Sequence, residues 1–261
     1  FIRMMLIMSG RRIRKWRARH GLNPRSPGLR MRFPDGRPIP VLHGFSRHII
    51  PRPEDWAESA IVTGYWYLNQ AEHWDPPKAL AEFLSRGEPP VYFGFGSIFG
   101  RDPKYVTRTI LEAVRRTGVR AVLARGWGGL EPAASAHSES VMFIGSAPHS
   151  WLFPQVSAVV HHGGCGTTAA GLLAGKPGII CPFFGDQPFW GRHIARLGAG
   201  PPPIPQKNVT VERLCHAIDM VMNDPAIRRN AAVLGNRLQK ENGASNAAAF
   251  ITQWMENLSW M

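Results

Sequence analysis

The stretch Ser157–Ala174, which reads SAVVHHGGCGTTAAGLLA, decides the fold. Residues 157–160 are a short apolar run of the kind that forms a buried β-strand. Two histidines and two glycines follow, and the small residues 166–174 predict a helix that begins directly after them. A strand, a tight glycine turn and a helix in this order are typical of one unit of a parallel α/β sheet.

The same alternation continues on both sides of this stretch. Further strands are predicted at 91–95, 119–123, 141–144 and 178–181, with helices after most of them. Asp102, Thr210 and Ser245 are predicted helix N-caps, because short polar side chains accept hydrogen bonds from the first free N–H groups. The predicted fold class is therefore α/β, a Rossmann-like parallel sheet with helices on both faces. In such sheets ligands bind outside the carboxyl ends of the strands.

The segment from His162 to Thr168 carries chemistry suited to a phosphate or diphosphate. Gly164 and Gly166 let an anion approach the backbone N–H groups, and a helix N-terminus adds a partial positive charge. Thr167 and Thr168 offer hydroxyl donors, and His162 offers an N–H donor or a charge. The alternative is a structural glycine turn with capping threonines. The segment is neither a Walker A loop nor a GxGxxG fingerprint, which argues against an ATPase or a simple NAD enzyme.

Other strand ends supply further candidates. Ser97 ends the run FGFGS and could reach the same anion; the alternative is an ordinary turn. Trp127 lies among glycines and is either a stacking platform for a base or a lid over the core. Asp186 and Gln187 form a carboxylate and amide pair suited to sugar hydroxyls, although Asp186 would also serve as a helix N-cap.

The charge of the chain is concentrated at one end. The formal net charge is +13, but thirteen Lys and Arg and one Asp lie within residues 1–52. The remaining residues are nearly neutral, so the composition does not indicate a nucleic-acid-binding protein. A basic helix at 11–19 either docks on an anionic surface or is simply solvated. Three unpaired cysteines and the lack of a long apolar run favour a cytoplasmic location, with peripheral membrane contact as an open alternative.

Taken in order, these motifs resemble the carboxyl-terminal half of a GT-B fold, family 1 UDP-glycosyltransferase. The resemblance is strongest to the sterol 3-beta-glucosyltransferase-like branch. The matching stretches are VYFGFGS (91–97), GWGGL (126–130), SAPHSWLFPQ (146–155), HHGGCGTTAAG (161–171), PFFGDQPFWG (182–191), GPPPIP (200–205) and, more weakly, PEDWAESAIVTGYW (53–66).

The resemblance implies a role for each matching residue. His162, Gly164, Gly166 and Thr167 would hold the diphosphate of a nucleotide sugar, together with Ser97. Ala147 and His149 would face the nucleoside, and Asp186 and Gln187 would bind the sugar hydroxyls. Plant members of the family have a uracil-stacking tryptophan where Ser146 stands, a place that Trp127 could take. They also have a ribose-binding glutamate where Ala170 stands, so a dTDP-sugar stays an open alternative to a UDP-sugar.

The resemblance also implies a division of the chain and a reaction. Residues 1–52 are predicted to be a basic remnant of an amino-terminal acceptor domain, 53–90 an interdomain linker, and 91–261 the donor-binding domain. The implied reaction transfers a hexosyl group, glucose from UDP-glucose above all, to a sterol or lipid-like hydroxyl with inversion. No cofactor or metal is expected, and no residue is identified as the catalytic base, which the family carries in its amino-terminal domain.

Two alternatives remain beside this function. One is a bacterial natural-product glycosyltransferase that uses another UDP-sugar or a dTDP-sugar. The other is a binding or membrane-surface module that acts through its basic segment and has no activity of its own. The expected partners are a nucleotide sugar and a sterol, lipid or natural-product acceptor, without nucleic acid.

Overall fold

The computed structural model describes residues 2–23, 32–33, 35–69, 72, 74–95, 102–126, 130 and 139–258. These residues form two compact units. The smaller unit comprises residues 1–42 and 55–61, and the larger comprises 43–54 and 62–261. Whether the amino-terminal segment is the remnant of an acceptor domain stays a prediction.

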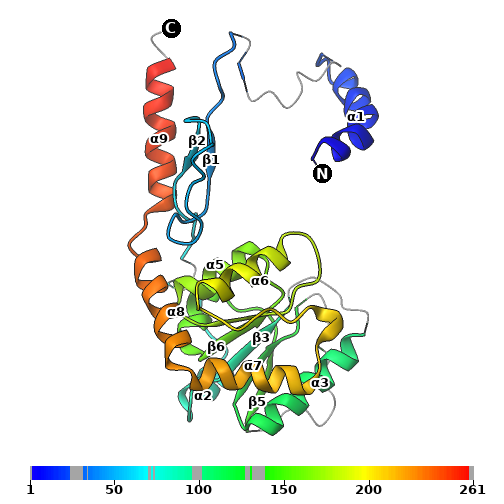
Figure 1. The fold of residues 1–261 in the computed structure, drawn as a ribbon, viewed down its shortest axis with the longest axis vertical. Coiled ribbons are helices and arrows are strands. Elements are labelled where there is room, and N and C mark those ends of the chain that lie inside the picture. The colour runs from blue at the N-terminus through cyan, green and yellow to red at the C-terminus, as the bar shows by residue number, and fades with distance from the viewer. Residues whose placement is uncertain are drawn as a thin grey trace. The chain divides into compact units, whose positions relative to one another are not determined.

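The larger unit is built on a parallel sheet (Figure 1). Its described strands are β3 (Val91–Gly94), β4 (Ala121–Ala124), β5 (Val141–Ile144), β6 (Ala158–His161) and β7 (Gly178–Ile180). They are ordered β5-β4-β3-β6-β7, and each pair of neighbours is parallel. From β3 the chain adds β4 and then β5 on one side of the sheet. It then returns to the other side of β3, where it adds β6 and β7. This order confirms the predicted α/β sheet.

Alternation along the strands sends side chains to both faces of the sheet. Val91 and Phe93 of β3 pack into one apolar cluster, whereas Tyr92 packs into another on the opposite face. Both clusters are buried, because helices cover each face. The strands are therefore apolar at successive positions, as expected for a parallel sheet that is buried on both sides.

Helices of the larger unit pack on both of these faces. Their bounds are α2 (Lys78–Ser85), α3 (Pro103–Thr117), α4 (His149–Leu152), α5 (Cys165–Leu173), α6 (Gln187–Arg196), α7 (Val211–Asn223), α8 (Pro225–Leu238) and α9 (Gly243–Leu258). Residues of α3 and α7 join the cluster of Val91 and Phe93, while residues of α2 and α5 join that of Tyr92. Helices on both faces confirm the predicted architecture.

Local capping signals place most of the helix starts correctly. The Asp102 carboxylate accepts a hydrogen bond from the Tyr105 N–H at 2.9 Å, and Thr210 Oγ1 accepts from the Arg213 N–H at 3.4 Å. Ser245 is different, because α9 begins at Gly243 and Ser245 lies inside its first turn. The prediction of Ser245 as N-cap is therefore wrong.

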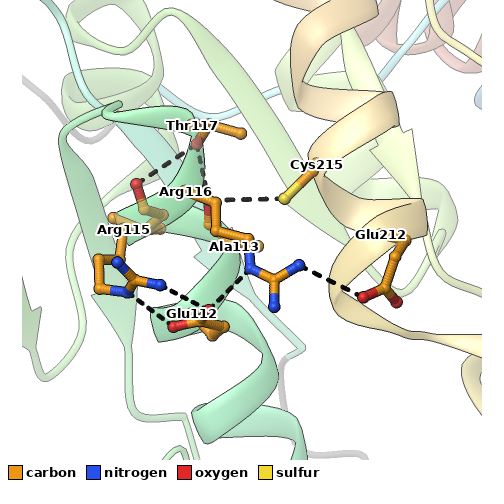
Figure 2. A network of polar contacts seen from close by, with 8 residues as sticks. Glu112, Ala113, Arg115, Arg116, Thr117, Glu212 and Cys215 are labelled. Carbon is orange, nitrogen blue, oxygen red and sulfur yellow. Dashed lines mark hydrogen bonds and ion pairs between the residues drawn. The ribbon is translucent and has the colours of Figure 1, made fainter.

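Polar contacts link α3 with α7 at the solvent edge of their packed surfaces (Figure 2). The Glu112 carboxylate pairs with Arg115 and Arg116 on its own helix, and Arg116 also reaches Glu212 of α7 at 3.4 Å. Beneath these ion pairs, Cys215 Sγ lies 3.8 Å from the Ala113 carbonyl oxygen. The pairs are exposed, so the buried apolar side chains below them dominate the stability of this contact.

The smaller unit contains helix α1 (Ile2–Arg19), which includes the basic segment predicted to be helical at 11–19. Strands β1 (Val41–His43) and β2 (Ala60–Val62) pair as a separate two-stranded sheet. None of the described helices has the length and apolar character needed to cross a bilayer.

Candidate functional site

The candidate site lies where the strand order changes direction, between β3 and β6. Gly94 at the end of β3 pairs with His161 at the end of β6, so the carboxyl ends of these two strands lie side by side. From here the chain turns toward β4 after β3 and toward β7 after β6. Such a switch point opens a crevice at the carboxyl edge of a parallel sheet, where ligands bind.

His161 and Gly163 shape the turn that leaves β6. The His161 side chain is 2% exposed, and its Nδ1 accepts a hydrogen bond from the Gly163 N–H at 3.1 Å. Burial above all lowers the pKa of His161 to about 3, which leaves the ring neutral and able to accept this bond. Gly163 has a φ of +89°, and a Cβ there would collide with Ile180. Only glycine suits this turn, because the backbone is left-handed and the space is closed.

His162 lies over the next glycine of the loop. A Cβ at Gly164 would lie 2.5 Å from His162 Nε2, so the His162 ring can take this position only because residue 164 has no side chain. Burial lowers the pKa of His162, and the nearby Asp186 carboxylate opposes that shift. The His162 Nδ1 atom is buried and makes no hydrogen bond to any described residue. A buried polar atom without a partner is rare in folded proteins and indicates a ligand, a water or stored strain.

The first turn of α5 follows this loop. Gly164 is the N-cap, and no side chain caps this end of the helix, so the first N–H groups have no partner within it. Gly166 is exposed, and a Cβ there would meet no other atom within 4 Å. Packing does not require this glycine, but its absent side chain leaves the helix end open to an anion.

The two threonines of the turn differ from each other. Thr167 is half-buried, and its hydroxyl makes no hydrogen bond to the described residues, so it can face a ligand. Thr168 is 3% exposed, and its hydroxyl donates to the Gly164 carbonyl oxygen at 2.9 Å. The expectation of a free Thr168 donor therefore needs correction, because its proton already serves the helix start.

Asp186 and Gln187 lie between β7 and α6 and take different environments. Asp186 is exposed and occupies the N-cap position of α6, but its side chain makes no capping hydrogen bond. Its carboxylate instead accepts a hydrogen bond from Trp190 Nε1 at 2.9 Å. Gln187 is 5% exposed, and its Oε1 accepts from the backbone N–H groups of Phe183 and Phe184 at 2.8 and 3.2 Å. Asp186 therefore holds the predicted N-cap position without capping the helix through its side chain. A ligand can meet the Asp186 carboxylate, whereas Gln187 shapes the loop that carries it.

The predicted nucleoside segment starts α4 beside the same edge. Ala147 is partly buried against the apolar cluster of Tyr92, and His149 is the first residue of α4. The His149 ring stacks on Phe153 with 4.2 Å between centroids, and burial lowers its pKa. His149 therefore offers a neutral imidazole fixed by an aromatic neighbour.

Tyr65 and Glu241 also reach this part of the domain, and the sequence did not single them out. Together with His149 they line a pocket of about 450 Å³. The Tyr65 hydroxyl and Glu241 Oε2 are buried without a partner among the described residues. No local pattern could have revealed them, since they lie 176 positions apart in the chain.

Two predicted site residues, Ser97 and Trp127, lie outside the described residues. Within the described ranges, no three His, Cys, Asp or Glu side chains come together as metal ligands.

Comparison with known proteins agrees with the fold and the loop. Residues 129–258 match the family described as erythromycin biosynthesis protein CIII-like, C-terminal domain. A sterol 3-beta-glucosyltransferase of Arabidopsis thaliana is 42% identical over 216 residues, which is 81% of this chain and 33% of the relative. One of Emericella nidulans is 39% identical over 254 residues, 94% of this chain and 18% of the relative.

A solved structure, the glycotransferase of kitacinnamycin, superposes with a TM-score of 0.72 at 23% identity over 95% of this chain and 62% of its own. The calicheamicin glycosyltransferase superposes with a TM-score of 0.65 at 19% identity over 83% of this chain and 52% of its own. These structures share the fold of the chain. The chain spans a third or less of the two curated relatives, and the resemblance drawn from its motifs is confirmed.

Proposed function

We propose that this chain binds the sugar donor of a UDP-glycosyltransferase that glucosylates a sterol or lipid-like hydroxyl. The observation that carries the proposal is the loop before α5. It presents an uncapped helix start, an open glycine at position 166 and a His162 ring with an unpartnered nitrogen. The identity to sterol 3-beta-glucosyltransferases over most of the chain supports the same assignment.

In this proposal the diphosphate lies across the start of α5. The first N–H groups of the helix and the Thr167 hydroxyl donate hydrogen bonds to its oxygens, and the helix dipole favours its charge. His162 lies beside the same loop and is kept neutral near pH 7 by burial, so it contributes a hydrogen bond and not a full charge. Ala147 and His149 lie next to the nucleoside.

The sugar is placed toward Asp186. Its carboxylate is exposed at the edge of the loop, where it can accept hydrogen bonds from sugar hydroxyls. The hydrogen bond from Trp190 Nε1 fixes one carboxylate oxygen and leaves the other available. Gln187 then acts mainly through the backbone of residues 183–184, which it holds in place.

The proposed reaction is an inverting transfer. The oxygen of the acceptor hydroxyl attacks the anomeric carbon, the bond from that carbon to the diphosphate oxygen breaks, and UDP leaves with the bonding electrons. The acceptor proton passes to a general base, a role we assign to no described residue. Negative charge grows on the departing diphosphate, and donors fixed at the helix start stabilise it without reorganising.

Titration calorimetry of the chain with UDP-glucose tests the donor site. We expect saturable binding in the unmodified chain and weaker binding in His162→Ala. His216→Ala, at an exposed histidine of α7, is the matched control and should bind like the unmodified chain. Absence of binding at millimolar ligand, or equal binding by His162→Ala, would contradict the site.

The finer assignments are also proposals. UDP-glucose competing better than a dTDP-sugar would favour the sterol-type donor over the natural-product alternative. Independence from metals and cofactors predicts that binding persists in EDTA. A cytoplasmic location and peripheral membrane contact through residues 1–52 stay predictions.

A further inference from the structure

The pocket of about 450 Å³ beside α5 contains buried polar atoms that have no hydrogen-bond partner among the described residues. It lies within the larger unit, and its lining includes Tyr65, His149, Ala174, Glu241 and Gly243. A cavity of this size is in the range that holds small ligands. Two of the three buried side-chain atoms that lack a hydrogen-bond partner among the described residues belong to this lining, namely Tyr65 Oη and Glu241 Oε2.

The two side chains are held firmly in place. Glu241 Oε1 accepts a hydrogen bond from the buried Ser46 hydroxyl at 2.8 Å, which fixes the carboxylate. The start of α9 lies directly against the backbone of Gly64 and Tyr65, so closely that a Cβ at Gly243 would not fit. Asn246 Nδ2 donates to the Thr63 carbonyl oxygen at 3.0 Å. The segment that carries Tyr65 is therefore anchored to the helix that follows Glu241.

Tyr65 and Glu241 offer complementary hydrogen-bonding groups. Burial raises the pKa of Tyr65, and the nearby Cys165 and Glu241 raise it further, so its hydroxyl keeps its proton and can donate. The free carboxylate oxygen of Glu241 can only accept. A donor and an acceptor left open in one pocket suit a ligand with adjacent hydroxyl groups.

The pocket meets the proposed nucleoside segment at the start of α4. His149, proposed to lie beside the nucleoside, is part of its lining, and Cys165, which lies near Tyr65, is the first residue of α5. Leu173 and Ala174, at the carboxyl end of α5, also line the pocket. Ala170 is 7% exposed within an apolar cluster and has no group to hydrogen-bond a ribose.

We propose that Tyr65 and Glu241 bind the ribose diol of the nucleotide. The inference rests on the proposed donor function and names the residues that select a ribonucleotide. The Tyr65 hydroxyl donates to one ribose oxygen, and Glu241 accepts from a ribose hydroxyl.

Calorimetric titration with UDP and with 2′-deoxy-UDP tests this assignment in the full chain. The unmodified chain should bind UDP about tenfold more tightly than 2′-deoxy-UDP, the loss expected when one hydrogen bond is removed. Tyr65→Phe and Glu241→Gln should each weaken UDP binding by about tenfold and narrow the difference between the two nucleotides. Tyr105→Phe and Glu256→Gln are matched controls on α3 and α9 and should keep the unmodified preference.

Thermal unfolding distinguishes a role of Tyr65 in binding the nucleotide from a role in stabilising the fold. Tyr65→Phe removes a hydroxyl that has no partner, so its unfolding midpoint should stay the same or rise while UDP affinity falls. Binding of both nucleotides with equal affinity, or an equal loss for both in the variants, would overturn the diol assignment and leave the donor site standing. Failure of the unmodified chain to bind UDP at all would instead overturn the donor site and this inference with it.

Discussion

Gly163 and Gly166, in the loop before α5 and at the start of that helix, are glycines for different physical reasons. Gly163 is required by the protein, because its backbone is left-handed and Ile180 fills the space of a side chain. Gly166 is not, because its Cβ would meet nothing and its φ is not positive. A glycine that the fold does not need, at an uncapped helix start, is best explained by what must approach it.

Gly166→Ala should therefore separate stability from binding. The free energy of unfolding should stay the same or rise by up to about 1 kcal/mol, because alanine favours the helix more than glycine does. UDP affinity should fall by about tenfold, because the methyl group blocks the open N–H groups. Chemical denaturation and calorimetry measure the two quantities. Gly171→Ala on the same helix, where a Cβ makes ordinary contact with Val159, is the control and should leave UDP affinity unchanged.

His161 should make stability depend on pH. Its pKa is about 3 in the folded chain and 6.5 when unperturbed, so the unfolded state takes up a proton first as the pH falls. The stabilising effect of the neutral ring is thus complete above pH 6.5 and declines below it, by about 1.4 kcal/mol per pH unit.

In His161→Asn this contribution disappears, while an amide oxygen can still accept from the Gly163 N–H. The loss of unfolding free energy between pH 6.5 and pH 5 should therefore be about 2 kcal/mol smaller in the variant than in the unmodified chain. Urea denaturation at both pH values measures it. An identical pH dependence in the two proteins would show that His161 is not buried in the neutral form.

At the scale of elements, the packing of α3 against α7 shows which contacts hold the domain together. Ile110 and Ile218 are almost fully buried in the cluster beneath the two helices, whereas the ion pairs of Glu112 and Arg116 lie in solvent. Glu112 is held ionised, with a pKa of about 2, by Arg115 and Arg116. Both partners of such a pair are almost as well solvated in the folded chain as in the unfolded chain. The ion pair therefore adds little to the free energy of unfolding.

Substitutions on these helices should follow that ranking. Ile218→Ala should lower the free energy of unfolding by about 2–5 kcal/mol, through lost burial and the cavity it leaves. Arg116→Ala (Figure 2) should leave the unfolding midpoint almost unchanged. Denaturant titration of both variants checks this, and an Arg116→Ala effect as large as that of Ile218→Ala would contradict it.

At the scale of the whole molecule, the charge and the proposed site are in different parts of the chain. The thirteen basic residues of 1–52 leave a nearly neutral remainder, and the proposed diphosphate donors are N–H groups, a hydroxyl and a neutral imidazole. Salt weakens the attraction between two charges more than it weakens a hydrogen bond from an uncharged donor.

UDP affinity should accordingly change by less than about threefold between 50 and 300 mM NaCl, whereas binding through several Lys or Arg side chains would fall far more steeply. Calorimetry at both salt concentrations measures this. A steep loss would indicate that the basic segment holds the nucleotide. Binding of the chain to anionic vesicles at both concentrations is the comparison, since attraction through residues 1–52 should be strongly salt-dependent.

The sequence by itself determined the order of strands and helices, most helix caps and the glycine loop before α5. These features depend on residues near one another in the chain: alternating apolar side chains, a short polar cap, a glycine before a helix. The fold class and the family resemblance followed from them and were confirmed. The Ser245 cap failed because the packing of Gly243 against Gly64 and Tyr65, and not a local side chain, sets where α9 begins.

Only the tertiary structure decided how the side chains of the site are used. Asp186 and Thr168 each bond a residue only four positions away, Trp190 and Gly164, but several such local partners are open to them and the folded conformation selects one. It also brought Tyr65 and Glu241 into one pocket from distant parts of the chain. Hydrogen-bond partners and burial depend on what packs nearby in space, and a parallel sheet with crossover helices draws those neighbours from far along the chain.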